Sequence, residues 1–148
     1  MITIETYIRN AEGEFLPLGE TISISFQANR RICGAIDMQV GYRPILRLDT
    51  WDDIDELWAY IVSMTVKFKK TGRACTLYPS QSTSLIFERI ENGLVKVSSG
   101  GSTRRAAALP ESELLTAVKT AGYSYFDTVE SYSNQGYARQ FSQLSQLP

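Results

Sequence analysis

The chain has 148 residues, of which 43% are hydrophobic and 21% charged, and its formal net charge at pH 7 is -1. Such a length and composition are typical of one globular domain with an ordinary hydrophobic core, and they argue against disordered and fibrous classes. Because fifteen basic residues are balanced by sixteen acidic ones, the chain has no overall positive field, which argues against nucleic acid as a partner.

The N-terminal segment 2–9 alternates apolar and polar side chains, with isoleucine at positions 2, 4 and 8. This two-residue period is typical of a half-buried strand. The segment lacks the charged and then apolar regions of a signal peptide. No apolar run in the chain approaches the roughly 20 residues needed to cross a bilayer. We therefore expect a cytoplasmic protein that has no membrane segment.

Three further strands are expected in the N-terminal half of the chain. Segment 21–26 alternates isoleucine and phenylalanine with threonine and serine, and we expect it to pair with the first strand. Segments 32–40 and 45–49 have the composition of two more strands, separated by a turn over 41–44. Gly34 interrupts the first of these two, and an isolated glycine in a strand often indicates a bulge.

The clearest pattern in the sequence predicts a helix over about 50–70. Asp49 or Thr50 is a good N-cap, acidic residues fill the first turn, and lysines precede Gly72 at the other end. This arrangement suits both poles of the helix dipole and a glycine C-cap. The apolar residues at helical spacing are Ile54, Leu57, Trp58, Ile61, Val62, Met64 and Phe68.

Strands are expected again at 74–78, 84–90 and 94–98. A turn starting at Pro79 separates the first two, and Asn92-Gly93 predicts a tight hairpin between the last two, because both residues tolerate positive φ. A flexible loop over 99–103 and a short stretch over 104–109 follow.

A second amphipathic helix is predicted over about 111–132, directly after Pro110. Its apolar residues at helical spacing are Leu114, Leu115, Val118, Ala121, Tyr125, Phe126, Val129 and Tyr132. Gly122 interrupts it and indicates either a kink or a close contact. The end of the chain, 135–148, has apolar residues at helical spacing that are typical of a short third helix or a docked tail. The sequence therefore predicts a single α+β domain over 1–148, with one or more antiparallel sheets of six to seven strands packed against two helices.

The chain contains no histidine, which excludes Ser-His-Asp and Cys-His mechanisms. Carboxylates crowd the segment 49–56, but their spacing is poor for calcium or magnesium, and the start of a helix already explains them. Cys33 and Cys75 are too few for a closed zinc site. We expect them to be buried free thiols, since a disulfide would require Cα atoms within about 7 Å of each other. No catalytic set, metal site or cofactor is predicted.

The loop around 100–105 is the one candidate anion site. Gly100, Gly101 and Ser102 offer backbone amides, and Arg104 and Arg105 offer two guanidinium groups, which together could bind a phosphate or an acidic partner. The segment is neither a Walker loop nor a dinucleotide-binding motif. A solvated loop explains the same residues.

Aromatic residues crowd the last quarter of the chain, and tyrosine is enriched where a surface meets a protein partner. One interpretation is a partner-binding or self-association face built from Tyr123, Tyr137, Arg139 and Phe141. The other places Tyr125, Phe126 and Tyr132 in the core, with the remaining aromatic side chains partly exposed.

The order of the elements, with the segments DTWDDIDELWAYIV and PESELLTAVKTAGYSYF and an Asn-Gly hairpin between them, resembles that of small bacterial α+β proteins, some of which are of the immunity type. The resemblance implies tight binding to a secreted toxin rather than catalysis. Three hypotheses follow: a non-enzymatic protein-binding domain of the immunity type, a small-ligand or anion-binding domain that uses the 100–105 loop, and an accessory subunit of a larger complex.

Overall fold

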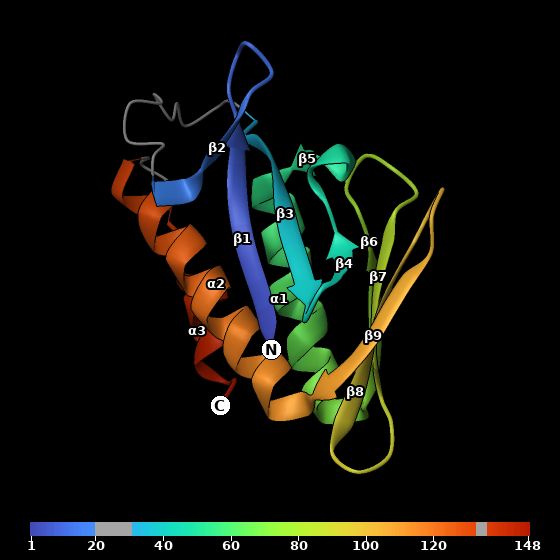
Figure 1. The fold of residues 1–148 in the computed structure, drawn as a ribbon. Coiled ribbons are helices and arrows are strands. Elements are labelled where there is room, and N and C mark those ends of the chain that lie inside the picture. Colours follow the sequence, from blue (N-terminus) through green and yellow to red (C-terminus); the bar gives the residue numbers. More distant parts are fainter. Residues whose placement is uncertain (20–30, 133–135) are drawn as a thin grey trace.

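The computed structural model describes residues 1–19, 31–132 and 136–148, and it shows an α+β architecture (Figure 1). Two antiparallel sheets, of five and four strands, pack with three helices. The strands of the first sheet are β1 (Ile2–Arg9), β2 (Phe15–Pro17), β3 (Cys33–Val40), β4 (Arg43–Leu46) and β5 (Asp52–Asp53). The strands of the second sheet are β6 (Arg73–Leu77), β7 (Ser84–Arg89), β8 (Leu94–Gly100) and β9 (Arg105–Pro110). The helices are α1 (Ile54–Thr71), α2 (Glu111–Tyr132) and α3 (Ala138–Ser145).

The first sheet has the order β2-β1-β3-β4, with β5 paired to β3, and the second has the order β6-β7-β8-β9. Helix α1 lies between the two sheets, α2 packs beside α1 against β1, and α3 packs on α1 and α2 (Figure 1). One buried hydrophobic cluster takes side chains from both sheets and all three helices. The position of α1 explains why its apolar face is so wide, since it must contact both sheets.

The predicted apolar faces of the two long helices are confirmed. In α1 the seven predicted residues are all buried, and Trp58 donates from Nε1 to Thr6 Oγ1 of β1 at 3.0 Å. In α2, Leu114, Val118, Tyr125 and Phe126 are each fully buried. Tyr132 is an exception, because 41% of it is exposed at the end of the helix rather than in the core.

Helix α1 begins later than predicted. Its N-cap is Asp53, whose Oδ1 accepts from the Glu56 amide at 3.0 Å, and not Asp49 or Thr50. Residues 48–50 form a single 3-10 turn, and Asp52 and Asp53 then pair with β3 as the short strand β5. This pairing holds the backbone extended for two more residues, which delays the helix. The predicted C-cap is confirmed, since Gly72 is left-handed and its amide donates to the Phe68 carbonyl.

Several strand predictions need correction. Segment 104–109, for which the sequence predicts no strand, is the edge strand β9, and β8 continues to Gly100 instead of ending at 98. Strand β4 begins at Arg43 instead of 45 and ends at 46, because the turn after β3 uses only residues 41 and 42. Pro44 is tolerated because β4 is an edge strand. The strand predicted over 21–26 lies outside the described residues. Among the described strands, β1 pairs with β3 and with β2, which the sequence did not predict.

Gly34 does not form a bulge. It pairs regularly with Ile8 on one side and Asp52 on the other, and the register shift in β3 lies between Met38 and Gln39. A Cβ at position 34 would collide with the Tyr7 carbonyl oxygen and lie 3.2 Å from Ile54 Cβ. Glycine is therefore required here by the close approach of β1 and α1.

The short third helix is confirmed, and Gly122 explains how it packs. A Cβ at Gly122 would lie 3.2 Å from Leu144 of α3 and 3.3 Å from Trp58 of α1. The glycine therefore marks a close contact of three helices, one of the two predicted alternatives. Among the helices that the structure describes, none is both long enough and apolar enough to span a membrane.

Candidate functional site

The acidic segment at the start of α1 is occupied by structural contacts. Asp52 is 4% exposed, and its Oδ2 accepts from the Ser80 amide at 2.9 Å, while its Oδ1 accepts from the Asp53 amide at 2.7 Å. Burial alone would raise the pKa of Asp52, but these backbone hydrogen bonds outweigh it and leave the pKa below its usual value. Asp52 thus ties β5 to the turn between β6 and β7.

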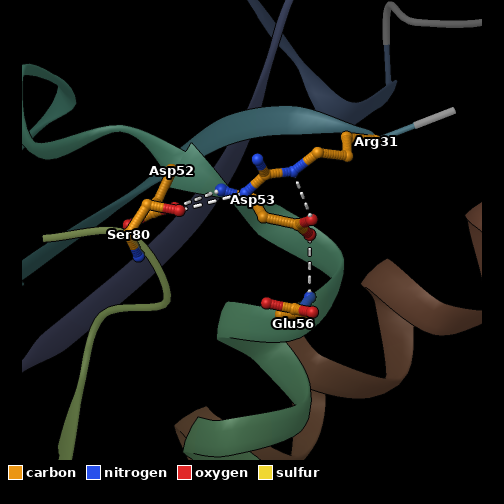
Figure 2. Close-up of polar contacts among 5 residues, drawn as sticks. All are labelled: Arg31, Asp52, Asp53, Glu56 and Ser80. Carbon is orange, nitrogen blue, oxygen red and sulfur yellow. Dashed lines mark hydrogen bonds and ion pairs between the residues drawn. The ribbon is translucent and has the colours of Figure 1, made fainter.

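Asp53 has a similar structural use. Figure 2 shows its carboxylate between Arg31, whose Nε donates to Oδ2 at 3.1 Å, and the Glu56 amide that it caps. Arg31 also donates from its second terminal nitrogen to Ser80 Oγ at 3.0 Å. In the part of the chain that the structure describes, no group of three acidic or cysteine side chains is arranged to hold a metal ion.

Asp55 points to the opposite side of the helix. Its Oδ1 accepts from the Tyr137 hydroxyl at 2.7 Å and from the Tyr125 hydroxyl at 3.0 Å. Burial raises the pKa of the Asp55 carboxyl, and the two tyrosine hydrogen bonds offset this only in part. These contacts fasten α1 to α2 and to the residue that precedes α3.

Half of the partner face predicted in the last quarter of the chain packs against the core instead of facing solvent. Tyr137 is 5% exposed and its ring lies 4.9 Å from that of Phe126, so it belongs to the core and not to an exposed face. Phe141 is half-buried against the core, and its ring lies 5.2 Å from that of Tyr123. Only Tyr123, at 53% exposure, and Arg139 are exposed.

The strongest candidate surface is one that the sequence did not predict, the outer side of the second sheet. The inner side of this sheet packs against the hydrophobic core. Its fully buried side chains include Leu85, Phe87, Val95 and Val97, each at 0% exposure. In Figure 1 the outer side of β6–β9 faces away from all three helices. No described element covers it, and we call it the outer face.

The strand register arranges the outer face in rows. Cys75, Ile86, Ser98 and Ala106 stand opposite one another across the four strands and form its central row. The row on one side is Leu77, Ser84 and Gly100. The row on the other side is Arg73, Glu88, Lys96 and Ala108. The middle of the outer face is therefore small or apolar, and charge stands at its border.

Two hollows run along the outer face and share Ser84 and Ile86. One, of about 620 Å³, lies beside β6 and is lined by Tyr60 of α1 and Leu77, which are 43% and 61% exposed. The other, of about 450 Å³, lies over β8 and β9 and is lined by Lys96 and Arg104. The central row thus lies in a continuous shallow depression.

The predicted anion loop is the rim of this depression. Gly100, Gly101, Arg104 and Arg105 all line the second hollow, and Ser102 is exposed at the tip. The loop joins β8 to β9 in a hairpin, so no helix N-terminus lies behind its amides as in a phosphate-binding loop. Arg104 is exposed and faces the hollow, whereas Arg105 is half-buried opposite Ser99.

The cysteines are also placed differently from the prediction. Both are free, but Cys75 is exposed in the central row of the outer face, and Cys33 is half-buried in the other sheet. The sequence contained a signal for the outer face. Strands β6, β7 and β9 read RACTL, SLIFER and RAAALP, and each has apolar residues at both odd and even positions. A strand with one solvated face alternates apolar and polar residues instead.

The chain matches no protein-family model, no curated protein and no solved structure.

Proposed function

We propose that this chain is a non-enzymatic protein-binding domain and that a protein partner binds the outer face of β6–β9. The observation that carries the proposal is the central row, where Cys75, Ile86 and Ala106 occupy positions that solvent-facing strands normally fill with polar side chains. Small and apolar side chains that gather on an exposed surface, with polar residues around them, are typical of a protein interface.

The composition of the border supports the same proposal. Tyr60 is exposed beside the apolar centre, and tyrosine and arginine are the residues that interfaces favour. Arg104 and Lys96 line the hollow over β8 and β9, on opposite sides of the central row. The shallow, open form of the two hollows suits the flat surface of a protein better than a small substrate, which is usually enclosed on most sides.

The proposal includes no chemistry, and three of the acidic side chains that crowd the start of α1 already have structural partners. Asp52, Asp53 and Asp55 hold a turn, a helix cap and two tyrosines, as described above. The sequence has no histidine to transfer a proton near neutral pH. The sequence suggests two classes of protein partner. If the chain is an immunity-type inhibitor, the partner is a secreted toxin; if it is an accessory subunit, the partner is another subunit of an enzyme complex.

The test is affinity capture from a lysate of the source cells, with the wild-type chain compared with Ile86→Asp. A charge at the centre of the interface should remove a partner that the wild type retains in stoichiometric amount. Thr3→Asp, an exposed strand position in the first sheet, is the matched control and should retain the partner. Retention by Ile86→Asp as strong as by wild type would contradict the proposal, and so would the absence of any stoichiometric partner.

A further inference from the structure

The outer face has an uneven charge, although the whole chain carries a net charge of -1. Its border holds three exposed basic side chains, Arg73, Lys96 and Arg104, together with the half-buried Arg105, and a single acidic one, Glu88. Glu88 accepts from Arg73 Nε at 3.2 Å, so that pair is already neutralised. Lys96 and Arg104 are both exposed and line the same hollow over β8 and β9.

From this arrangement we infer that the partner presents an acidic amphipathic segment, whose apolar side chains lie on the central row and whose carboxylates meet Lys96 and Arg104. This inference rests on the proposed function and names the chemistry of the partner. Arginine and lysine beside an apolar surface are complementary to carboxylates, and charge complementarity selects the partner and speeds its association. The hollow lies directly beside Ile86 and Ala106, so one segment can reach both features.

The same charges argue against a second copy of this chain as the occupant. Two outer faces placed together would bring Lys96 and Arg104 from both copies into one interface, with only the already paired Glu88 of each copy to balance them. Like charges across an interface are costly. A small anion is less favoured as well, because the loop lacks a helix N-terminus and the hollow opens onto an apolar sheet.

The test is a selection of phage-displayed random 16-residue peptides on the immobilised full-length chain, with sequencing of the enriched peptides. We expect enrichment of aspartate and glutamate together with apolar residues, and binding of the enriched peptides that weakens as salt is added. The double variant Lys96→Glu/Arg104→Glu should bind those peptides at least about tenfold more weakly and should itself enrich lysine and arginine. The control Arg43→Glu/Arg139→Glu makes the same change of net charge at exposed positions elsewhere and should keep the wild-type selection.

The possible failures are distinguishable. Enriched peptides without an excess of acidic residues would overturn the acidic partner while leaving a binding face, provided that Ile86→Asp abolishes their binding. No enrichment at all would count against the proposed function itself. A concentration-dependent dimer abolished by Ile86→Asp would make a second copy the occupant. Thermal stabilisation by inorganic phosphate that Arg104→Glu removes and Ile86→Asp preserves would assign a small-anion site instead.

Discussion

Asp52 and Asp55 are three residues apart, and the fold shifts their pKa values in opposite directions. Asp52 is held by backbone amides that favour its ionised form, so its pKa lies below the usual value. Asp55 is buried between helices, and burial raises its pKa in spite of the two tyrosine hydroxyls. A lowered folded pKa contributes stability above the unfolded value of about 3.9, whereas a raised one contributes stability below it.

We therefore expect the two asparagine variants to show opposite pH dependence. The contribution of Asp52 is lost as pH falls through its folded pKa, so Asp52→Asn should be destabilising near neutral pH by about 1–3 kcal/mol, and less so at pH 3. The contribution of Asp55 is lost as pH rises through its folded pKa, so Asp55→Asn should improve relative to wild type between pH 3 and 7. Urea unfolding across this range measures both, and parallel pH profiles for the two variants would contradict the assignment.

Gly34 provides a second prediction for a single residue. Alanine at this position should lower the free energy of unfolding by more than about 2 kcal/mol, because its Cβ collides with the backbone of β1 and the neighbouring Ile54 is fully buried. Gly136→Ala is the matched control, since nothing lies within 4 Å of a Cβ at that position. Its effect should stay within about 0.5 kcal/mol. Equal effects of the two substitutions in urea unfolding would argue against the close approach.

The sequence signals Gly34 and Gly122 without saying what either contacts. A glycine within a strand or helix marks a position where something special occurs, but whether this is a bulge, a kink or a neighbour depends on residues far away in the chain. At Gly122 the neighbours are Trp58 and Leu144. The same limit explains Tyr137, which the sequence shows only as one of several crowded aromatic residues. Its contacts with Asp55 and Phe126 make it part of the core.

Among the elements, α3 depends most on one narrow contact. Gly122→Leu would place a bulky side chain between α2, Trp58 and Leu144, and overpacking of this kind typically costs about 1–3 kcal/mol. The gain from replacing a helical glycine, about 1 kcal/mol, is too small to offset it. Thr116→Leu, an exposed position of the same helix, is the control and should be close to neutral. We also expect Gly122→Leu to raise the rate of amide hydrogen exchange in α3. An exchange rate equal to that of the control would contradict the close contact of α2 with α3 at Gly122.

The helices and hairpins were predictable because their signals are local. Periodic apolar residues identify α1 and α2, and Asn92 and Gly93 take the positive φ angles that a tight turn requires. The edge elements were not predictable in the same way. Strand β5 exists only because β3 lies beside it, and β9 consists largely of alanines, whose weak strand preference reveals nothing before β8 pairs with them.

The outer face was missed for a related reason. Its residues come from four strands, and only the register brings Cys75, Ile86, Ser98 and Ala106 into one row. The 100–105 loop was predictable as a candidate anion site because its glycines and arginines are neighbours in the sequence, and the structure places it at the rim of the outer face. Neighbouring residues in the sequence therefore predict the charged border of the candidate site, but not its apolar centre.

At the scale of the whole molecule, α1 connects the two sheets through one continuous core. Trp58 reports on the first sheet and α2, since it bonds Thr6 and stacks on Tyr125 at a centroid distance of 6.3 Å. Phe87 belongs to the second sheet and contacts Phe68 of α1 at 5.8 Å. Loss of packing at Phe87 should therefore also destabilise the region around Trp58 and lower the urea concentration at which its fluorescence changes.

We expect Phe87→Ala, in a Trp51→Phe background that leaves Trp58 as the only tryptophan, to lower the free energy of unfolding by about 3–5 kcal/mol. The transitions followed by Trp58 fluorescence and by far-UV circular dichroism should shift together to the same lower urea concentration. Ile86→Ala, one residue away on the outer face, should shift both by less than about 1 kcal/mol, since its side chain has no buried cluster to leave. In the contrary outcome, the urea midpoint of the Trp58 transition is unchanged by Phe87→Ala while the dichroism transition splits into two. The two sheets would then unfold separately, which would refute a shared core. A large effect of Ile86→Ala would mean that the outer face serves stability, and this would also weaken its assignment as a binding surface.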